Sequence, residues 1–319
     1  MNPTKPVHCD GFFNARNWAN PFLLYLEVSA MSFKQRQIDI QFTYKDGSGV
    51  DKTLALKGYR CHCEVIGDNA DATGLAHVQI YGMSIAHMNA LTDVGTDQIA
   101  NAQNTMTITA GNAGEPLDQV FYGNVTSSYI DFTGSPEVYL CVIGAPVMAY
   151  QAAPAAGNSF KGAVSVAEAI ESLAAQMGYA FTNHDVTTRI NNQHLDGSIV
   201  QQIQTLAHAG TCTVTFDHKT VTITPNGGST KDQVIELSPE TGLIGYPTAI
   251  QSSYACTCEF NPRLRNLGRV HLSGSVIDRA NGEWSICLIK HSLSTLTNKG
   301  PWFSTFQFIP NNATTISSF

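Results

Sequence analysis

Two short segments of the chain resemble each other and carry residues that could bind a metal. They read YRCHCEV at residues 59–65 and YACTCEF at residues 254–260, so each follows the pattern Tyr-x-Cys-x-Cys-Glu. Cysteine and histidine side chains are zinc ligands, but zinc sites usually take their cysteines from a C-x₂₋₄-C turn. On a strand, a C-x-C pair holds parallel side chains about 6.8 Å apart at Cα, and His62 points to the opposite face. We therefore expect buried strand cysteines and no metal site.

Nucleophilic catalysis would need a nucleophile, a base and an orienting group close together in space. The sequence has no G-x-S-x-G pattern. His77 and His271 alternate with apolar residues, which indicates ordinary strand positions, and the His8–Cys9 pair is terminal. The other candidates are scattered: His62, His87, His184, His194, His208, His218 and His291, and Cys61, Cys63, Cys141, Cys212, Cys256, Cys258 and Cys287. We predict no catalytic, cofactor-binding or metal-binding residues.

Paired carboxylates, as in glycosidases, need not be close in sequence. Asp131, Glu137, Glu236 and Glu240 are the candidates, and no feature of the sequence distinguishes them from solvated loop or strand-end charges. A hydrolase with carboxylates in a β cleft therefore stays open as an alternative.

Three further segments favour structural roles. GNAGEP at 111–116 has two glycines but lacks the Lys and Ser/Thr of a phosphate-binding loop, so it predicts a turn. NPRLRNLGR at 261–269 has three arginines, too few for a nucleic-acid site, and suits contact with an acidic partner. In GPWFSTF at 300–306, Trp302 and Phe303 follow a Gly-Pro turn and could pack in the core or anchor an interface.

The composition of the chain limits its function. It has 319 residues, 43% of them hydrophobic and only 13% charged, and a net charge of −7. A weakly charged exterior suits a protein that is covered by partners, since the cores of interfaces are depleted in charge. A nucleic-acid binder would need a basic face, which the acidic balance argues against. The N-terminus has no apolar signal segment, and no apolar run is long enough to span a bilayer, so we expect no membrane anchor.

Most of the chain has the pattern of β structure. Short segments rich in β-branched and aromatic residues, separated by Gly, Asn, Asp or Pro, indicate β structure in the first 150 residues, and the pattern returns after residue 230. SIAHMNAL at 84–91 is a short helical exception. Strands at this spacing without long helices predict an antiparallel barrel or sandwich.

A different pattern separates the two β parts. After a Pro/Gly/Ala-rich linker at 151–163, Ser165 with Glu168 and Ser198 with Gln201 predict the capped starts of two helices. A short strand, YAFTN, lies between them, and a hairpin turning at 217–219 follows the second helix.

The two β parts share a short pattern. In each, the Tyr-x-Cys-x-Cys-Glu strand is followed by a loop and a strand with a histidine, His77 or His271, 13 or 12 residues after the glutamate. This favours two versions of one β domain, with the cysteine doublets marking equivalent strands. We therefore predict a mainly β protein with two related tube-like β-barrel domains (1–155 and 231–319, the second with a polar C-terminal tail) flanking an α+β domain (156–230).

The order of these parts resembles the bacteriophage tail hub, or baseplate hub, proteins. In that family an FNP.L..G..V.L strand pair, an NG.W.I strand, an H.L element and a G.W.T strand follow one another. The matching positions here are Phe260–Pro262, Leu264, Gly268, Val270, Leu272, Asn281–Gly282, Trp284, Ile286, His291, Leu293, Gly300, Trp302 and Ser304. Ser304 stands where Thr is common. The helices and hairpin of the middle domain and the strand DQVFYGNV are also similar, so the resemblance covers residues 30–308.

The resemblance implies a structural protein of the virion with no catalytic residues. It implies a homotrimer at the tip of a phage tail, assembled in the cytoplasm of the host bacterium, in which two tube-like domains per chain give a pseudo-sixfold ring. Such a ring joins the tail tube to the central spike, meets the tape-measure protein, and lets DNA pass through its lumen without specific binding. A β-rich hydrolase of cell-wall glycan or peptide and a carbohydrate-binding module are the alternatives.

Overall fold

The computed structural model describes residues 34–45, 49–67, 74–92, 103–250 and 253–310. The chain divides into two compact units, Met1–Lys34 and Gln35–Phe319, and everything below concerns the second. His8 and Cys9 lie outside the described residues.

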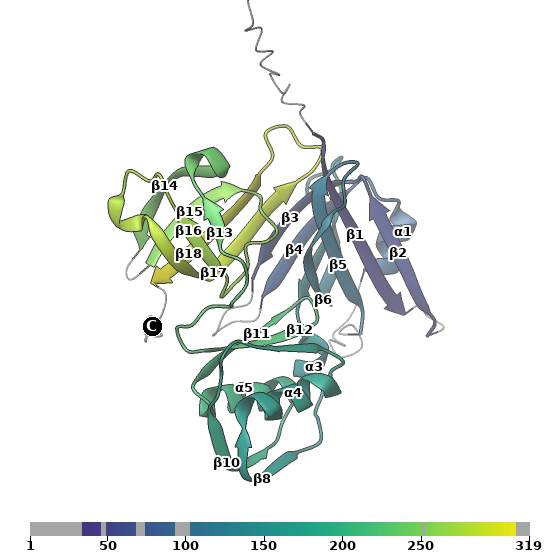
Figure 1. The fold of residues 1–319 in the computed structure, drawn as a ribbon. Helices are drawn as coiled ribbons and strands as arrows, with labels where there is room; N and C mark the ends of the chain where they lie inside the picture. Colours follow the sequence, from purple (N-terminus) through teal and green to yellow (C-terminus); the bar gives the residue numbers. More distant parts are fainter. Residues whose placement is uncertain (1–33, 46–48, 68–73, 93–102, 251–252, 311–319) are drawn as a thin grey trace, which may run out of the picture. The chain divides into compact units, whose positions relative to one another are not determined.

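Thirteen strands from both β parts form one sheet (Figure 1). The first part contributes β1 (Arg36–Lys45), β2 (Asp51–Lys57), β3 (Arg60–Ile66), β4 (Leu75–Tyr81), β5 (Thr105–Asn112), β6 (Asp118–Asp131) and β7 (Tyr139–Ala145), with helix α1 (Ile85–Leu91). The second contributes β13 (Ile235–Leu237), β14 (Leu243–Ile250), β15 (Ser253–Glu259), β16 (Arg269–Leu272), β17 (Gly282–Ser294) and β18 (Trp302–Pro310), with the 3-10 helices η1 (Pro239–Thr241) and η2 (Asp278–Ala280). The prediction of a mainly β chain is confirmed.

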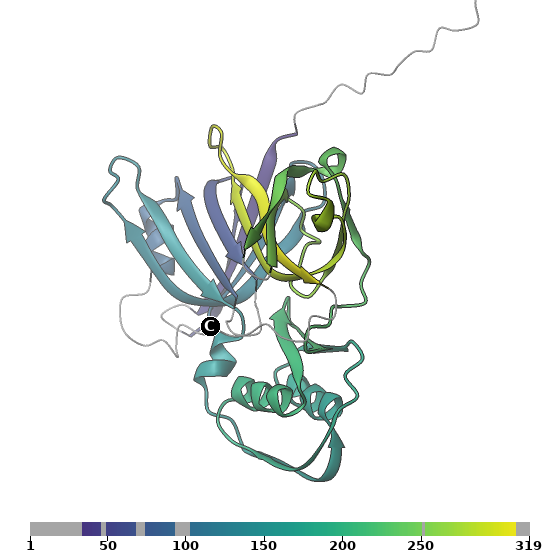
Figure 2. The ribbon, with the colours of Figure 1, turned by 90° about the vertical axis from the view of Figure 1, so that its left-hand side faces the viewer.

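Strand β17 joins the two parts. Its first half pairs with β16, most of its length pairs with β18, and its last five residues pair with β3 of the first part. The sheet therefore runs β14-β15-β18-β17-β3-β4-β7-β6-β5-β1-β2, with β16 and β13 branching from β17. Strands of both parts lie side by side in Figure 2. Beneath the sheet, one hydrophobic cluster fills the first part and another fills the second.

The two β parts share one strand order. The series β3-β4-β7-β6-β5-β1 in the first part corresponds, in both chain order and sheet order, to β14-β15-β18-β17-β16-β13 in the second. A one-residue bulge also recurs, at Thr126 between β6 and β7 and at Cys287 between β17 and β18. Just before each bulge, Val125 N–H donates to the Asn104 carbonyl (2.8 Å) and Ile286 N–H donates to the Gly268 carbonyl (2.9 Å). The one reversal is that β13 pairs in parallel with β16, whereas β1 is antiparallel to β5.

This correspondence corrects one prediction. The cysteine doublets lie on β3 and β15, but β3 corresponds to β14, and β15 corresponds to β4. Moreover β3 pairs with β4, the strand of His77, whereas β15 does not pair with β16, the strand of His271. The doublets are therefore not on equivalent strands. Each doublet places two cysteine side chains on the buried face of its strand. Buried side chains occur at every second residue on any core strand, so this pattern does not identify equivalent strands.

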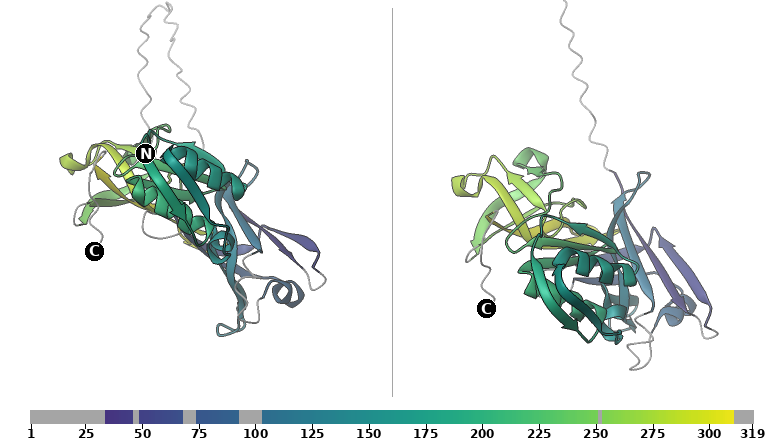
Figure 3. Two further views of the ribbon diagram at one scale, coloured as in Figure 1. Left: turned by 90° about the horizontal axis from the view of Figure 1, so that it is seen from below. Right: turned by 60° about the horizontal axis from the view of Figure 1, so that its bottom comes forward.

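The middle part has its own hydrophobic cluster. Helices α4 (Val166–Gln176) and α5 (Ile199–Ala209) lie side by side (Figure 3) and pack against the three-stranded sheet of β9 (Ala180–Asn183), β11 (Cys212–Asp217) and β12 (Thr220–Pro225). As predicted, Ser198 and Gln201 form a capping box. Ser165 is at the N-cap of α4, but its side chain makes no capping hydrogen bond, which corrects that prediction.

Three elements were not predicted in the middle region. Strands β8 (Asn158–Ser165) and β10 (Arg189–Leu195) form a separate two-stranded sheet, and a short helix α3 (Met148–Ala152) follows β7. β8 occupies much of the segment predicted as a linker. Its side chains are mostly exposed or half-buried, so its sequence lacks the alternation that marks a core strand. The proposed domain boundaries at 155 and 230 stay a prediction.

Candidate functional site: the polar face of the sheet

One face of the sheet carries polar side chains across eight consecutive strands, from β14 through β15, β18, β17, β3, β4 and β7 to β6. The opposite face packs on the two hydrophobic clusters. We call the first surface the polar face. On the seven strands from β15 to β6 its side chains include Arg60, His62, Glu64, His77, Gln79, Tyr81, Ser127, Tyr129, Asp131, Tyr139, Cys141, Thr257, Glu259, Lys290, Ser292, Phe303, Thr305 and Gln307.

The polar face is continuous because β17 and β3 meet in register. Ser292 lies opposite Glu64 and Lys290 opposite Ile66. Thr295, just beyond β17, fixes the end of the junction: its N–H donates to the Cys61 carbonyl (3.0 Å), and its Oγ1 accepts from Cys61 N–H (3.1 Å) and donates to the Tyr59 carbonyl (2.8 Å). Thr295, which directly follows β17, is thus hydrogen-bonded to the start of β3 in the first β part.

Both basic side chains of the polar face are neutralised by carboxylates of the same chain. Lys290 Nζ lies 2.9 Å from Glu64 Oε1, and hydrogen bonding to Lys290 lowers the pKa of Glu64. Arg60 makes two hydrogen bonds to Glu137, at 3.0 and 2.9 Å, and stacks over the Tyr81 ring at 4.1 Å. A phosphate backbone passing this face would find no cation among these residues without a counter-charge.

An aromatic pair connects this ion pair to Asp131. The rings of Tyr81 and Tyr139 are 5.0 Å apart, and Tyr139 Oη donates to Asp131 Oδ2 at 2.7 Å. This hydrogen bond raises the pKa of Tyr139 to about 12. The pKa of Asp131 is lowered mainly by the hydrogen bond from the Thr133 hydroxyl and, to a smaller extent, by the one from Tyr139.

Three of the four carboxylates considered for catalysis have a pKa shifted in the direction opposite to the one that a general acid needs. Asp131 and Glu137 are both anchored on the first β part, and the pKa values of Asp131, Glu137 and Glu240 are all lowered, by Thr133, Arg60 and Ser238 respectively. A general acid in a hydrolase needs a raised pKa. These carboxylates therefore serve as hydrogen-bond acceptors.

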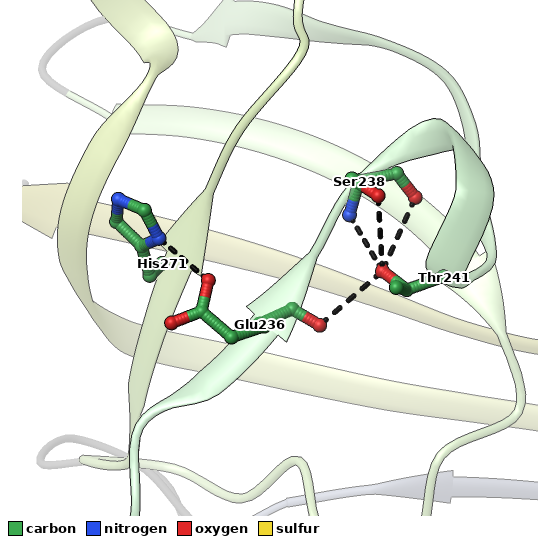
Figure 4. Close-up of polar contacts among 4 residues, drawn as sticks. All are labelled: Glu236, Ser238, Thr241 and His271. Atoms are coloured by element: carbon green, nitrogen blue, oxygen red, sulfur yellow. Dashed lines mark hydrogen bonds and ion pairs between the residues drawn. The ribbon is translucent and has the colours of Figure 1, made fainter.

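Glu236 lies on β13, close to the capped turn of η1: the Thr241 hydroxyl donates to the Glu236 carbonyl at 3.3 Å (Figure 4). Glu236 on β13 lies opposite His271 on β16, with 2.6 Å between Glu236 Oε2 and His271 Nδ1. The Ser238 N–H donates to Thr241 Oγ1 at 2.7 Å, closing a capped turn that leads directly into β14. This polar network fixes the turn that sets the position of β14.

The cysteine doublets are structural. Cys61 and Cys63 lie in the first hydrophobic cluster, and Cys256 and Cys258 lie in the second. Burial raises the pKa of Cys61 and of Cys258 to about 12, which keeps the thiols protonated. Among the described residues, no group of three or more His, Cys, Asp or Glu side chains is placed to hold a metal.

The sequence did not indicate that Cys141 and His77 are neighbours. His77 Nε2 lies 3.1 Å from Cys141 Sγ, across β4 and β7 on the polar face. Burial raises the pKa of the Cys141 thiol, and only 1% of the residue is exposed. The pair is therefore not an activated nucleophile, since reactive cysteines have a lowered pKa and some exposure.

The basic segment 261–269 contacts acidic groups of its own chain. Arg265 binds Asp217 Oδ2 at 2.6 Å and also contacts His218, at the tip of the β11–β12 hairpin. Arg269 donates to the Asp232 carbonyl at 2.8 Å and lies near Glu283. An external acidic partner for this segment stays a prediction. Segment 111–116 forms the predicted turn, with Gly114 at φ 84°.

Several motif residues of the C-terminal part contact one another, and Phe260 and Trp302 among them pack with the hydrophobic cluster of the first β part. Phe260 packs edge-on against His291 (5.5 Å) and against Trp302 (5.2 Å). Ser304 Oγ accepts from the Asn261 N–H (3.1 Å) and lies 2.9 Å from His291 Nδ1. Because Ser304 is 0% exposed and His291 6% exposed, this pair stabilises the fold and cannot reach a substrate. Trp302 is thus a core residue, whereas Phe303 is exposed on the polar face.

Known structures share this fold. The prophage MuSo2 43 kDa tail protein from Shewanella oneidensis superposes with a TM-score of 0.55 at 10% identity, over 87% of this chain and 97% of that one. The tail protein from Neisseria meningitidis MC58 gives a TM-score of 0.57 at 10% identity, over 86% and 96%. The Escherichia coli c3393 protein, a component of the type VI secretion system, gives 0.52 at 11% identity, over 80% and 74%.

Sequence comparison identifies the family. No curated protein sequence matched the chain. Within the described residues, no helix has the length and apolar composition needed to cross a bilayer. The profile of the family described as baseplate hub gp41 matches residues 38–304, which is most of the chain. This protein therefore belongs to the baseplate hub gp41 family.

Proposed function

We propose that three copies of this chain form a pseudo-sixfold ring at the tip of a phage tail, with the polar face lining a channel for DNA. Membership of the baseplate hub family gives the chain a structural role in the phage tail. The observation that carries the finer proposal is the polar face: eight consecutive strands share one surface, and its two basic side chains are paired with carboxylates. Such a surface gives a polyanion little to bind.

The repeated strand order supports the change of symmetry. A chain with two copies of one strand arrangement can present six similar units when three chains assemble. A sixfold tail tube could then meet one side of the ring and a threefold central spike the other, with the tape-measure protein in the channel. One structural relative was solved in a PdpA–VgrG complex, with a TM-score of 0.52 over 90% of this chain, so this fold occurs in a protein that assembles with a partner. The proposed place of action is the virion, after assembly in the host cytoplasm.

The ring proposal is tested by the mass and shape of the purified protein. Light scattering should give three times the chain mass of 34.4 kDa, and negative-stain images should show a ring with an axial channel. A monomer at every accessible concentration and salt would contradict the ring. The same preparation should not hydrolyse peptidoglycan or glycan, and a turnover that survives repeated purification would contradict a purely structural role.

A further inference from the structure

We propose that β14 of one copy pairs antiparallel with the end of β6 of the next copy, and that this contact closes the ring. The proposal rests on the proposed function, and it specifies the partner, the strands and the register. It follows from the within-chain junction between β17 and β3, because β6 corresponds to β17 and β14 corresponds to β3.

Among the described strands, β6 and β14 each have an edge that no other strand covers. β6 pairs with β5 only as far as Asn124, and from Ser127 to Asp131 it pairs with β7 alone among the described strands. The corresponding stretch of β17 is covered by β3. β14 pairs with β15 on one side and, within the described residues, with no strand on the other. Unpaired backbone groups at such edges are templates for another strand.

The register can be derived from the repeat. Within the chain, Lys290, His291 and Ser292 lie opposite Ile66, Val65 and Glu64. Counting from the shared bulge, the first three correspond to Tyr129, Ile130 and Asp131. Through the pairing with β15 and β4, the second three correspond to Ile250, Ala249 and Thr248. Tyr129 should therefore lie opposite Ile250 of the neighbour, Ile130 opposite Ala249, and Asp131 opposite Thr248.

Residues of β14 and β6 are more exposed than their counterparts at the β3–β17 junction, which supports a missing partner strand at both edges. Val65 is 4% exposed where β17 covers it, whereas its counterpart Ala249 is exposed. Tyr129 is 45% exposed and Ile250 is 42% exposed, although both are large and apolar in character. Tyr246 and Phe132, each 57% exposed, and Ile244, 41% exposed, lie on or next to the same two edges. Apolar side chains gathered along two open edges mark an interaction surface.

The contact would be heterologous, because two different edges meet. A heterologous contact generates a closed ring or an open helix, depending on the rotation between copies. β14 is irregular at Gly245–Pro247, where the pairing with β15 shifts by two residues and proline lacks an N–H. The regular pairing proposed here is therefore confined to Thr248–Ile250, shorter than the five pairs of the within-chain junction.

Engineered disulfides test the register directly. Opposed residues of antiparallel strands have Cα atoms about 4.5–5.5 Å apart, within disulfide reach. The double variant Tyr129→Cys/Ile250→Cys should give covalent dimers and trimers on oxidation, seen on a non-reducing gel and removed by reductant. The matched control Tyr129→Cys/Ile244→Cys places the second thiol about four residues out of register and should stay uncrosslinked, as should each single variant.

Charge substitutions provide a second test that does not depend on oxidation. Tyr129→Lys or Ile250→Asp alone should weaken assembly by about tenfold or more, because a lone charge would face an apolar partner. The double variant Tyr129→Lys/Ile250→Asp should recover most of the lost affinity through an ion pair across the contact. Val276→Lys, at a side chain that is 69% exposed in the loop between β16 and β17, should leave assembly unchanged. Thermal unfolding checks that each variant folds.

The outcomes separate this inference from the proposed function. The edge pairing would be overturned, and the ring kept, if the wild type is a trimer, the Tyr129→Cys/Ile250→Cys variant forms no crosslink, and the two single charge variants still assemble. A wild-type chain that is monomeric at every concentration, with no crosslinks, would contradict both. Crosslinked trimers together with charge-swap rescue would establish the contact.

Discussion

His291 is a buried histidine whose neutral state stabilises the fold. Burial is the main reason that its pKa falls to about 4; the charge of Asp217 raises the pKa by less, and the charge of Arg265 lowers it further. Its Nδ1 lies 2.9 Å from Ser304 Oγ, and the Phe260 ring packs on its face. The sequence motif pointed to these residues but not to their role. Only the folded structure shows that they meet, because they come from three separate segments.

The lowered pKa of His291 predicts sensitivity to acid. An unfolded histidine titrates near pH 6.5, whereas the folded one titrates near pH 4, so between these values the unfolded state binds the extra proton. The free energy of unfolding should therefore fall as the pH falls from 6.5 to 4, by about 3 kcal/mol in total from this group. His291→Gln removes this contribution, so the stability advantage of wild type over the variant should shrink at low pH.

Urea unfolding from pH 4.5 to 7.5 measures this difference. Ser304→Ala is the matched control, because it removes the hydroxyl but keeps the buried imidazole. It should lower stability by about 1–3 kcal/mol at every pH and keep the wild-type pH dependence. A stability difference between wild type and His291→Gln that is independent of pH would show that His291 does not set the acid response.

At the scale of elements, the sequence predicted what local chemistry determines. The N-terminal capping box of α5 and the β11–β12 hairpin are confirmed. β8 and β10 were missed because their few buried positions leave no alternating pattern. The pairing of β17 with β3 joins residues more than two hundred positions apart, so no local pattern could indicate it. The prediction that the cysteine doublets mark equivalent strands was wrong because every core strand alternates buried and exposed side chains.

The two predicted helix caps differ in the structure, which allows a matched test. The Ser198 side chain accepts from the Gln201 N–H at 3.2 Å, whereas the Ser165 side chain makes no capping hydrogen bond. Ser198→Ala should therefore lower the free energy of unfolding by about 1 kcal/mol. Ser165→Ala should lower it by clearly less. Equal losses in chemical denaturation of the two variants would contradict the assignment of the capping box.

At the scale of the whole molecule, the repeat would let one chain supply two units of the proposed ring. The shared bulge, strand order and hydrogen bond before the bulge indicate the same arrangement twice, although the two parts have little sequence in common. Among the described residues, the second part has no counterpart of β2, and its short strand β13 pairs in parallel with β16. These differences lie away from the polar face, which keeps the same strand order on both sides of the β17–β3 junction.

The neutralised charges of the polar face lead to a prediction about DNA. Thr257 and Thr305 are opposed on β15 and β18 and share a hydrogen bond of 3.2 Å on this face. Replacing both by lysine would add two cations per chain, of which Glu259, two residues along β15 on the same face, could neutralise at most one. Because phosphate contacts release counterions, DNA affinity should rise steeply at low salt and fall as salt increases. The wild-type assembly should bind DNA weakly throughout.

Fluorescence anisotropy with a labelled duplex over 50–300 mM salt would measure this change. Thr257→Gln/Thr305→Gln is the control for side-chain size, and Lys161→Gln with Thr182→Lys moves a cation within the middle part, away from the polar face. If the polar face lines the channel, virions that carry the lysine variant should assemble but release DNA more slowly. An unchanged rate of DNA release, with the lysines present in assembled particles, would place the polar face outside the channel.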